Sequence, residues 1–173
     1  MRRALIAIGT TVAMGVQAPL AQMAAQDAFG AANDLCSAAI VADGPLTAAG
    51  DALRAAGWSV DYATNVGPEA QTLRASARAN GQRGFYQAET DAAGGIFRLR
   101  CALEWQGFDG TLDLAGVAAA FGMEGGVTPM LDGGEYGTWS MELDEGLALY
   151  TAIHVEGYFL FQMIWVEWGA PRG

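Results

Sequence analysis

The chain has 173 residues, no lysine, and nine arginines against 19 acidic side chains, for a net charge of −10 at pH 7. A surface this acidic repels nucleic-acid phosphates and anionic lipid headgroups, which argues against binding to either. The length is that of one domain with a single hydrophobic core.

The N-terminus has the layout of a secretory signal peptide. Arg2 and Arg3 precede an uncharged apolar run, 4–16, and small residues follow it. This pattern predicts a Sec-type signal peptide over residues 1–21, cleaved after Ala21 or Ala25, and one globular domain over 22–173. The run is too short for a membrane-spanning helix, which needs about 18 residues or more, although an uncleaved anchor is the alternative. We expect a periplasmic or secreted protein without an integral membrane segment in the mature chain.

Two cysteines fall on apolar faces of predicted elements. Residues 26–42 form a predicted helix in which Cys36 lies at helical spacing from Phe29, Ala32 and Ile40. In the predicted strand 97–105, the alternation points Cys101 inward. An exported chain with two cysteines favours a disulfide between Cys36 and Cys101. Two buried thiols or a redox pair are the alternatives.

Residues 45–79 contain patterns of a helix, a strand and a weaker helix. A second helix is predicted over 45–56 and a strand over 58–62. Residues 68–79 predict a weak third helix, on which Arg74 and Arg78 lie one turn apart. This pair of arginines forms either a solvated helix face or an anion site.

The middle of the chain predicts a hairpin, a helix and a long loop. Strands are expected at 84–90 and 97–105, joined by a glycine-containing turn. Thr111 is placed to cap a helix that ends at Phe121. The glycine-rich stretch 122–134 predicts a long connection without regular structure, of the kind that is often functional or mobile.

Residues 134–168 predict three consecutive antiparallel strands. Glu156-Gly157 has the spacing of a two-residue hairpin loop, which places Val155 opposite Tyr158. Asp144-Glu145-Gly146 is interpreted as a three-residue loop with glycine in the left-handed conformation, which places Ser140 opposite Tyr150.

With this register, the meander has two different faces. One face is aliphatic, and we expect it to face the core; it comprises Trp139, Met141, Leu143, Leu147, Leu149, Ile153, Val155, Leu160, Ile164 and Val166. The other face is aromatic and polar, and its candidate binding residues are Tyr136, Tyr150, His154, Phe161 and Trp165. Either helices of the same chain cover this second face, or it binds a protein partner or a small apolar ligand.

Together the elements predict an α+β fold. The expected domain is an antiparallel sheet that contains the C-terminal three-stranded meander, flanked by two or three N-terminal helices and one mid-chain helix. The sequence shows no internal repeat, and its motifs match no family that we recognise.

Motifs of catalysis and cofactor binding are absent. His154 is the single histidine, and no metal-ligand spacing or phosphate-binding glycine loop occurs, so we expect neither a metal nor a cofactor. The leading hypothesis is an exported binding or accessory module that is not an enzyme. One alternative is a small periplasmic hydrolase using His154 with Ser140, Tyr136 or Glu142. Another is a self-associating structural protein, a homodimer through the aromatic face or through an exposed final strand, 158–168.

Overall fold

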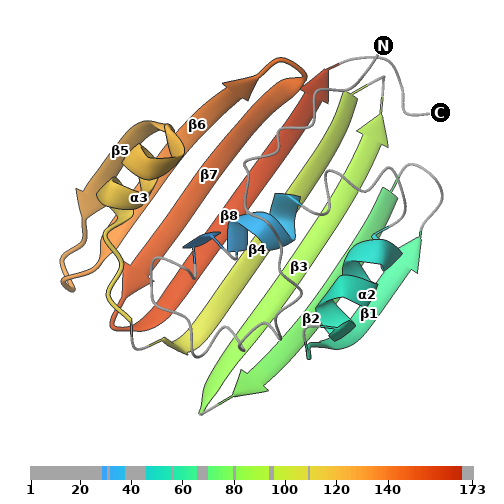
Figure 1. Cartoon of the computed structure of the whole chain (residues 1–173), viewed down its shortest axis with the longest axis horizontal. Coiled ribbons are helices and arrows are strands. Elements are labelled where there is room, and N and C mark those ends of the chain that lie inside the picture. Colours follow the sequence, from blue (N-terminus) through green and yellow to red (C-terminus); the bar gives the residue numbers. More distant parts are fainter. Residues whose placement is uncertain are drawn as a thin grey trace.

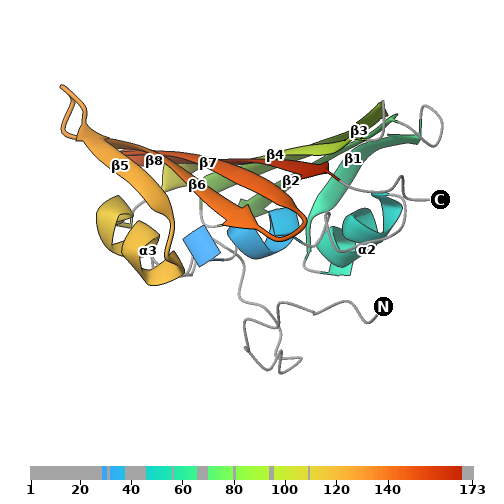
Figure 2. The same cartoon turned by 90° about the horizontal axis from the view of Figure 1, so that it is seen from above.

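One eight-stranded antiparallel sheet dominates the molecule, and the helices among the described residues lie against one of its faces (Figures 1 and 2). The computed structural model describes residues 29–30, 32–37, 46–55, 57–65, 70–79, 81–93, 96–108 and 110–168. The strand order is β1-β2-β3-β4-β8-β7-β6-β5, so the two edges are β1 and β5 and the centre is the β4–β8 pair.

The strands are long and the helices short. The strands are β1 (Ser59–Asn65), β2 (Ala70–Ala79), β3 (Gln82–Ala93), β4 (Ile96–Phe108), β5 (Glu124–Pro129), β6 (Glu135–Leu143), β7 (Gly146–Val155) and β8 (Gly157–Trp168). The helices are α2 (Thr47–Ala55) and α3 (Leu114–Phe121), and residues 29–30 and 32–37 are also helical.

The predicted α+β class is therefore wrong, because the described chain is predominantly one sheet. The largest single error is the predicted helix 68–79, since residues 70–79 form β2. Leu73 and Ala75 are buried while Arg74 and Arg78 are exposed, which is the two-residue alternation of a strand. A spacing of four residues puts two arginines on one face of a strand as well as of a helix, so this pair could not distinguish the two.

The predicted 122–134 loop is also wrong, because β5 lies within it and pairs with β6. This edge strand lacks the usual alternation, since only Val127 of its side chains packs against the core. Gly125 has φ +155°, and a Cβ there would lie 2.1 Å from the carbonyl oxygen of Thr138. Glycine thus allows the close approach of two backbones that a larger residue would prevent.

The other predicted elements are confirmed where the structure describes them. Helix α2 buries Ala49 and Leu53, and Leu46 just before the helix is buried too, as the spacing predicts. The hairpin of β3 and β4 is also present. Helix α3 is present too, but its cap is Asp113 rather than Thr111. The Asp113 carboxylate accepts a hydrogen bond from the Gly116 amide at 2.9 Å.

The order of elements repeats, which the sequence does not show. A helix followed by four antiparallel strands occurs first as α2 with β1–β4 and again as α3 with β5–β8. The two helices lie near opposite edges of the sheet (Figure 1). The last two hairpins of each half have two-residue loops, flanked by the pairs Ala79–Gln82 and Ala93–Ile96 in the first half and Leu143–Gly146 and Val155–Tyr158 in the second.

The helical residues 29–30 and 32–37 anchor the centre of the core. The Phe29 ring meets Phe161 edge-on, with ring centroids 4.9 Å apart, and Cys36 forms a disulfide with Cys101 of β4. The Tyr86 hydroxyl donates to the Leu35 carbonyl at 3.4 Å. Burial raises the pKa of Tyr86, so its hydroxyl stays protonated and able to donate. The predicted disulfide is thus confirmed, and it ties this segment to the middle of the sheet.

The ring of Trp105 on β4 packs over its cross-strand partner, Gly84 on β3. The Trp105 indole nitrogen donates to the buried side-chain oxygen of Gln82 at 2.6 Å, and its ring packs against Trp58 at 5.9 Å. A Cβ on Gly84 would lie only 1.7 Å from the Trp105 ring. The absence of a side chain at Gly84 therefore makes room for the indole.

Replacing Gly84 with alanine should lower the free energy of unfolding by about 1–3 kcal/mol, because the held indole must shift to admit a methyl group. Urea denaturation measures the change. Gly126→Ala is the matched control, since it adds the same methyl group where no heavy atom lies within 4 Å. Equal stabilities for the two variants would contradict the packing described for Trp105.

Candidate binding face

The C-terminal meander is confirmed as β6, β7 and β8, and one of its two predicted turns is confirmed. Val155 pairs with Tyr158 across Glu156-Gly157, so the predicted register of β7 on β8 holds over the whole hairpin. The other turn is shorter by one residue than predicted. Leu143 pairs with Gly146, which leaves Asp144-Glu145 as a two-residue loop.

A slip of one residue moves every side chain of β6 to the other face. Trp139 pairs with Tyr150 and joins the aromatic face, whereas Tyr136, Ser140 and Glu142 lie on the opposite face. Tyr136 is therefore on the other side of the sheet from the rest of the predicted binding set.

The predicted core face is wrong as well, because the aromatic face is the buried one. Phe161 is 0% exposed, and Tyr150 and Trp165 are also buried beneath the helix-bearing side. Burial raises the pKa of the Tyr150 hydroxyl. In contrast, Leu149 and Ile164 of the aliphatic face are 40% and 37% exposed. The predicted binding residues Tyr150, Phe161 and Trp165 thus lie in the core.

His154 is half-buried at the end of the aromatic face, where it holds a loop against the sheet. Its Nε2 lies 2.9 Å from the carbonyl oxygen of Gly110, and its ring meets Phe108 edge-on at 5.7 Å. Its cross-strand partner is Glu135, whose carboxylate accepts from the Leu114 amide. Ser140, Tyr136 and Glu142 project from the opposite face, so the sheet itself separates them from the imidazole.

We call the side of the sheet without described helices the open face (Figure 2). Its part over β6, β7 and β8 is here called the apolar half, because β7 and β8 carry aliphatic side chains there, whereas β6 contributes Tyr136, Thr138, Ser140 and Glu142. The aliphatic side chains of the apolar half are Leu147, Leu149, Ile153, Val155, Leu160, Ile164 and Val166. An antiparallel sheet with one face in water normally carries polar side chains there, and the aliphatic side chains of β7 and β8 depart from this rule.

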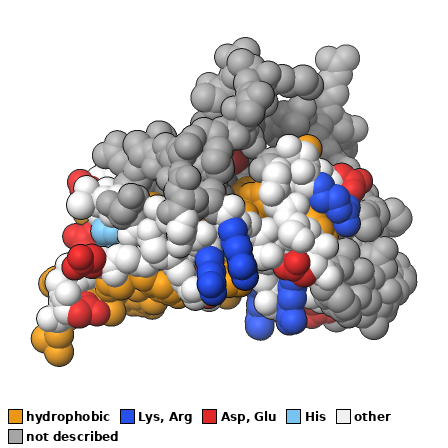
Figure 3. Space-filling view, turned by 90° about the horizontal axis from the view of Figure 1, so that it is seen from below, with side chains coloured by type: hydrophobic (Ala, Val, Ile, Leu, Met, Phe, Trp, Pro, Cys, Tyr) orange, Lys and Arg blue, Asp and Glu red, His pale blue; other side chains and the backbone are white. Residues whose placement is uncertain are grey.

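The part of the open face over β2, β3 and β4 is the arginine half. It carries Arg74, Arg78, Arg83, Arg98 and Arg100, which are five of the six arginines in the described ranges. Within those ranges only Arg98 of this group forms an ion pair, with Asp91 at 3.5 Å. Figure 3 shows arginines next to a hydrophobic surface along the open side of the molecule.

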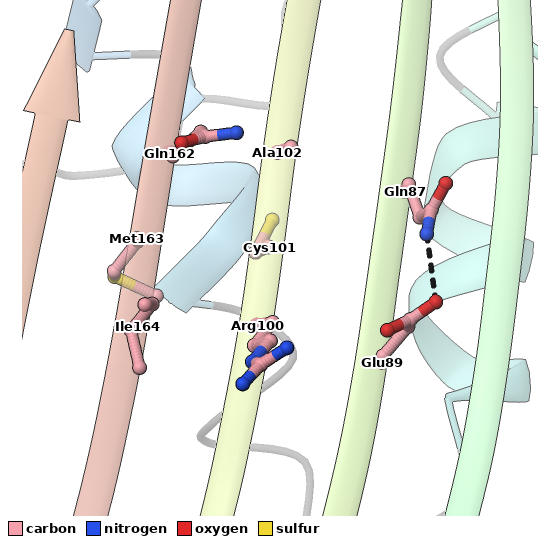
Figure 4. Close-up of a pocket in the computed structure, with 8 residues that line it drawn as sticks. All are labelled: Gln87, Glu89, Arg100, Cys101, Ala102, Gln162, Met163 and Ile164. Atoms are coloured by element: carbon pink, nitrogen blue, oxygen red, sulfur yellow. Dashed lines mark hydrogen bonds between the residues drawn. The ribbon is translucent and has the colours of Figure 1, made fainter.

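A depression of about 300 Å³ lies where the two halves meet (Figure 4). It forms around the small side chain of Ala102 on β4, which has Gln87 and Gln162 as its cross-strand neighbours. Arg100 and Ile164 line the same depression from adjacent strands. Polar and apolar groups therefore meet at the centre of the sheet.

The turn between β5 and β6 borders the apolar half and rises on the side away from the helices (Figure 2). Leu131 at this turn is fully exposed.

The open face was not predicted as a site, although the sequence contains the alternating pattern of its arginines. Arg98 and Arg100 alternate with buried residues, and Arg74 and Arg78 do the same in β2. Recognising β2 as a strand would have joined these two pairs into one surface.

Other kinds of site find little support in the described ranges. Those ranges contain no group of three or more histidine, cysteine or acidic side chains that could hold a metal ion. None of the helices described there has the length and apolar character needed to cross a membrane. Comparison with known proteins gives no family model, no curated protein and no solved structure that matches this chain.

Proposed function

We propose that this protein is an exported binding module without catalytic activity, and that its binding surface is the open face of the sheet. The observation that carries the proposal is the apolar half, where Leu149 and Ile164 stay more than a third exposed. Exposed apolar side chains that are grouped on one face are typical of interaction sites.

Export is supported by two independent features. The N-terminal sequence has the charge and hydropathy pattern of a signal peptide. The chain also forms the Cys36–Cys101 disulfide. Disulfides are typical of proteins in oxidising compartments, such as the periplasm or the cell exterior. Both features fit a module that meets its partner outside the cytoplasm.

Site-specific photocrosslinking in intact cells tests the binding surface. A photoreactive phenylalanine analogue replaces Leu149 at the centre of the apolar half, in the full-length exported chain. We expect one discrete adduct on illumination, because a partner that covers this face brings its atoms within reach of the probe. Mass spectrometry of the adduct identifies what has been captured.

The matched control places the same analogue at Ala120, which is exposed on α3 on the helix side. No discrete adduct is expected there. The proposal is wrong if Leu149 gives no adduct, or only the adducts that Ala120 also gives. A band at twice the protein mass would instead identify self-association.

A further inference from the structure

We infer that the partner is a second, different protein whose contacting surface is acidic beside an apolar patch. This inference rests on the proposed function and specifies the chemistry of its partner. The argument comes from the segregation of charge on the open face.

Positive charge is concentrated on the arginine half, although the protein is strongly acidic. The arginine half has five arginines and three acidic side chains, Glu89, Asp91 and Glu104. On the helix side the described charges are nearly all acidic, with Arg54 as the basic exception. Opposite charges on facing surfaces accelerate association and select the partner, so the arginine half favours a carboxylate-rich surface.

Four of these arginines are available for such carboxylates. Within the described ranges, Arg74, Arg78, Arg83 and Arg100 form no ion pair, and Arg78 and Arg83 sit directly opposite each other on β2 and β3. Like charges at opposite positions destabilise a sheet. An anionic partner would relieve this repulsion and could engage the planar guanidinium groups bidentately.

Arg100 joins the two halves into one surface. It pairs with Ile164 on β8, and Ile164 in turn pairs with Leu149 on β7. Arg100 also lies opposite Glu89 on β3. The cross-strand row therefore runs from this acid over Arg100 to aliphatic side chains, as Figure 4 shows for Arg100 and Ile164. A partner that follows the row from Arg100 onward would meet the cation with an acidic group and the aliphatic side chains with apolar groups.

A second copy of this chain fits the open face less well. Strands β7 and β8 pair over ten residues, and three strands of that length cover about 450 Å² per copy, or about 900 Å² in a symmetric dimer. Stable interfaces bury about 1,200 Å² or more, so a dimer would also have to use the arginine half. The arginines would then meet either each other or the apolar half, where only Glu142 is charged.

An anionic bilayer fits less well for a different reason. Five carboxylates lie among the apolar and basic side chains of the open face, from Glu89, Asp91, Glu104, Glu124 and Glu142. A uniformly anionic surface would repel each of them, whereas a protein can place apolar or basic groups opposite them.

The test combines the Leu149 photocrosslink with a matched pair of charge reversals. Arg100→Glu reverses a charge on the open face, and Arg54→Glu makes the same change on α2, where the side chain is 54% exposed. We expect Arg100→Glu to lower the yield of the adduct at least tenfold and Arg54→Glu to leave it within twofold. Arg100→Lys should keep most of the yield, and 0.5 M salt should reduce the yield in a periplasmic extract.

The outcomes separate this inference from the proposed function. If the adduct persists in Arg100→Glu, the partner does not bind through an acidic surface, and the inference is wrong. The proposed function, binding through the open face, then still stands. An equal loss in both glutamate variants also overturns the inference, since net charge alone would then explain the effect. Adducts to a second copy or to lipid would overturn it too. Equal melting temperatures of the variants confirm that the fold is intact.

Discussion

Replacing Cys36 and Cys101 together with alanine should lower the free energy of unfolding by about 4 kcal/mol. The disulfide spans a sequence separation of 65 residues, and loop-closure entropy gives about this value for a loop of that length. The bond also links the segment of residues 29–37 to β4 at the centre of the sheet, so its loss frees a part of the core that includes Phe29. Chemical denaturation of the exported protein measures the change.

Reduction of the wild-type protein is the control for this prediction, because it opens the disulfide without changing the sequence. The reduced wild type and the double alanine variant should unfold at similar denaturant concentrations. A loss below about 1 kcal/mol in both would show that packing, rather than the covalent link, holds the helical segment on the sheet.

The disulfide and the β7–β8 hairpin could be predicted because each rested on a local pattern with one physical solution. In β4, strict alternation placed Cys101 inward, and in the helix the spacing of Phe29 and Cys36 defined one buried stripe. The two-residue loop at Glu156-Gly157 likewise allows a single register. Gly157 has φ +76°, a conformation that glycine adopts at little cost.

The β6–β7 register could not be decided because two loops fit the same residues. Gly146 can serve as the left-handed residue of a three-residue loop or as the first residue of β7. The structure shows the second arrangement, in which Gly146 lies against the Trp165 ring and a Cβ would come within 2.8 Å of it. This contact depends on a residue nearly twenty positions away, which no local turn rule takes into account.

Which face becomes the core could not be predicted for a related reason. Both faces of the meander are apolar, so alternation separates the two sets of side chains but does not show which set is buried. The deciding contacts come from outside the meander, where Phe29 and Phe121 pack against each other and Phe29 also reaches Trp139 and Phe161. The aromatic rings are large enough to fill the space between the sheet and short helices, and they bury more area than the aliphatic side chains do.

Substitutions at two positions of β8 that face opposite sides of the sheet should show which face is the core. Phe161→Ala should cost about 3–5 kcal/mol of the free energy of unfolding, because it removes a fully buried ring and leaves a cavity among Phe29, Tyr150 and the sheet. Ile164→Ala should cost about 1 kcal/mol or less, since its side chain is already 37% exposed. Urea denaturation of both variants gives the comparison.

The same pair of variants also links the fold to the proposed function. Ile164→Ala should lower the stability only slightly and should weaken the Leu149 adduct, because Ile164 and Leu149 are cross-strand partners on the open face. Phe161→Ala should lower the stability while leaving the open face chemically unchanged. If Ile164→Ala were the more destabilising of the two, the aliphatic face would be the core, and the binding surface would have to lie among the aromatic side chains instead.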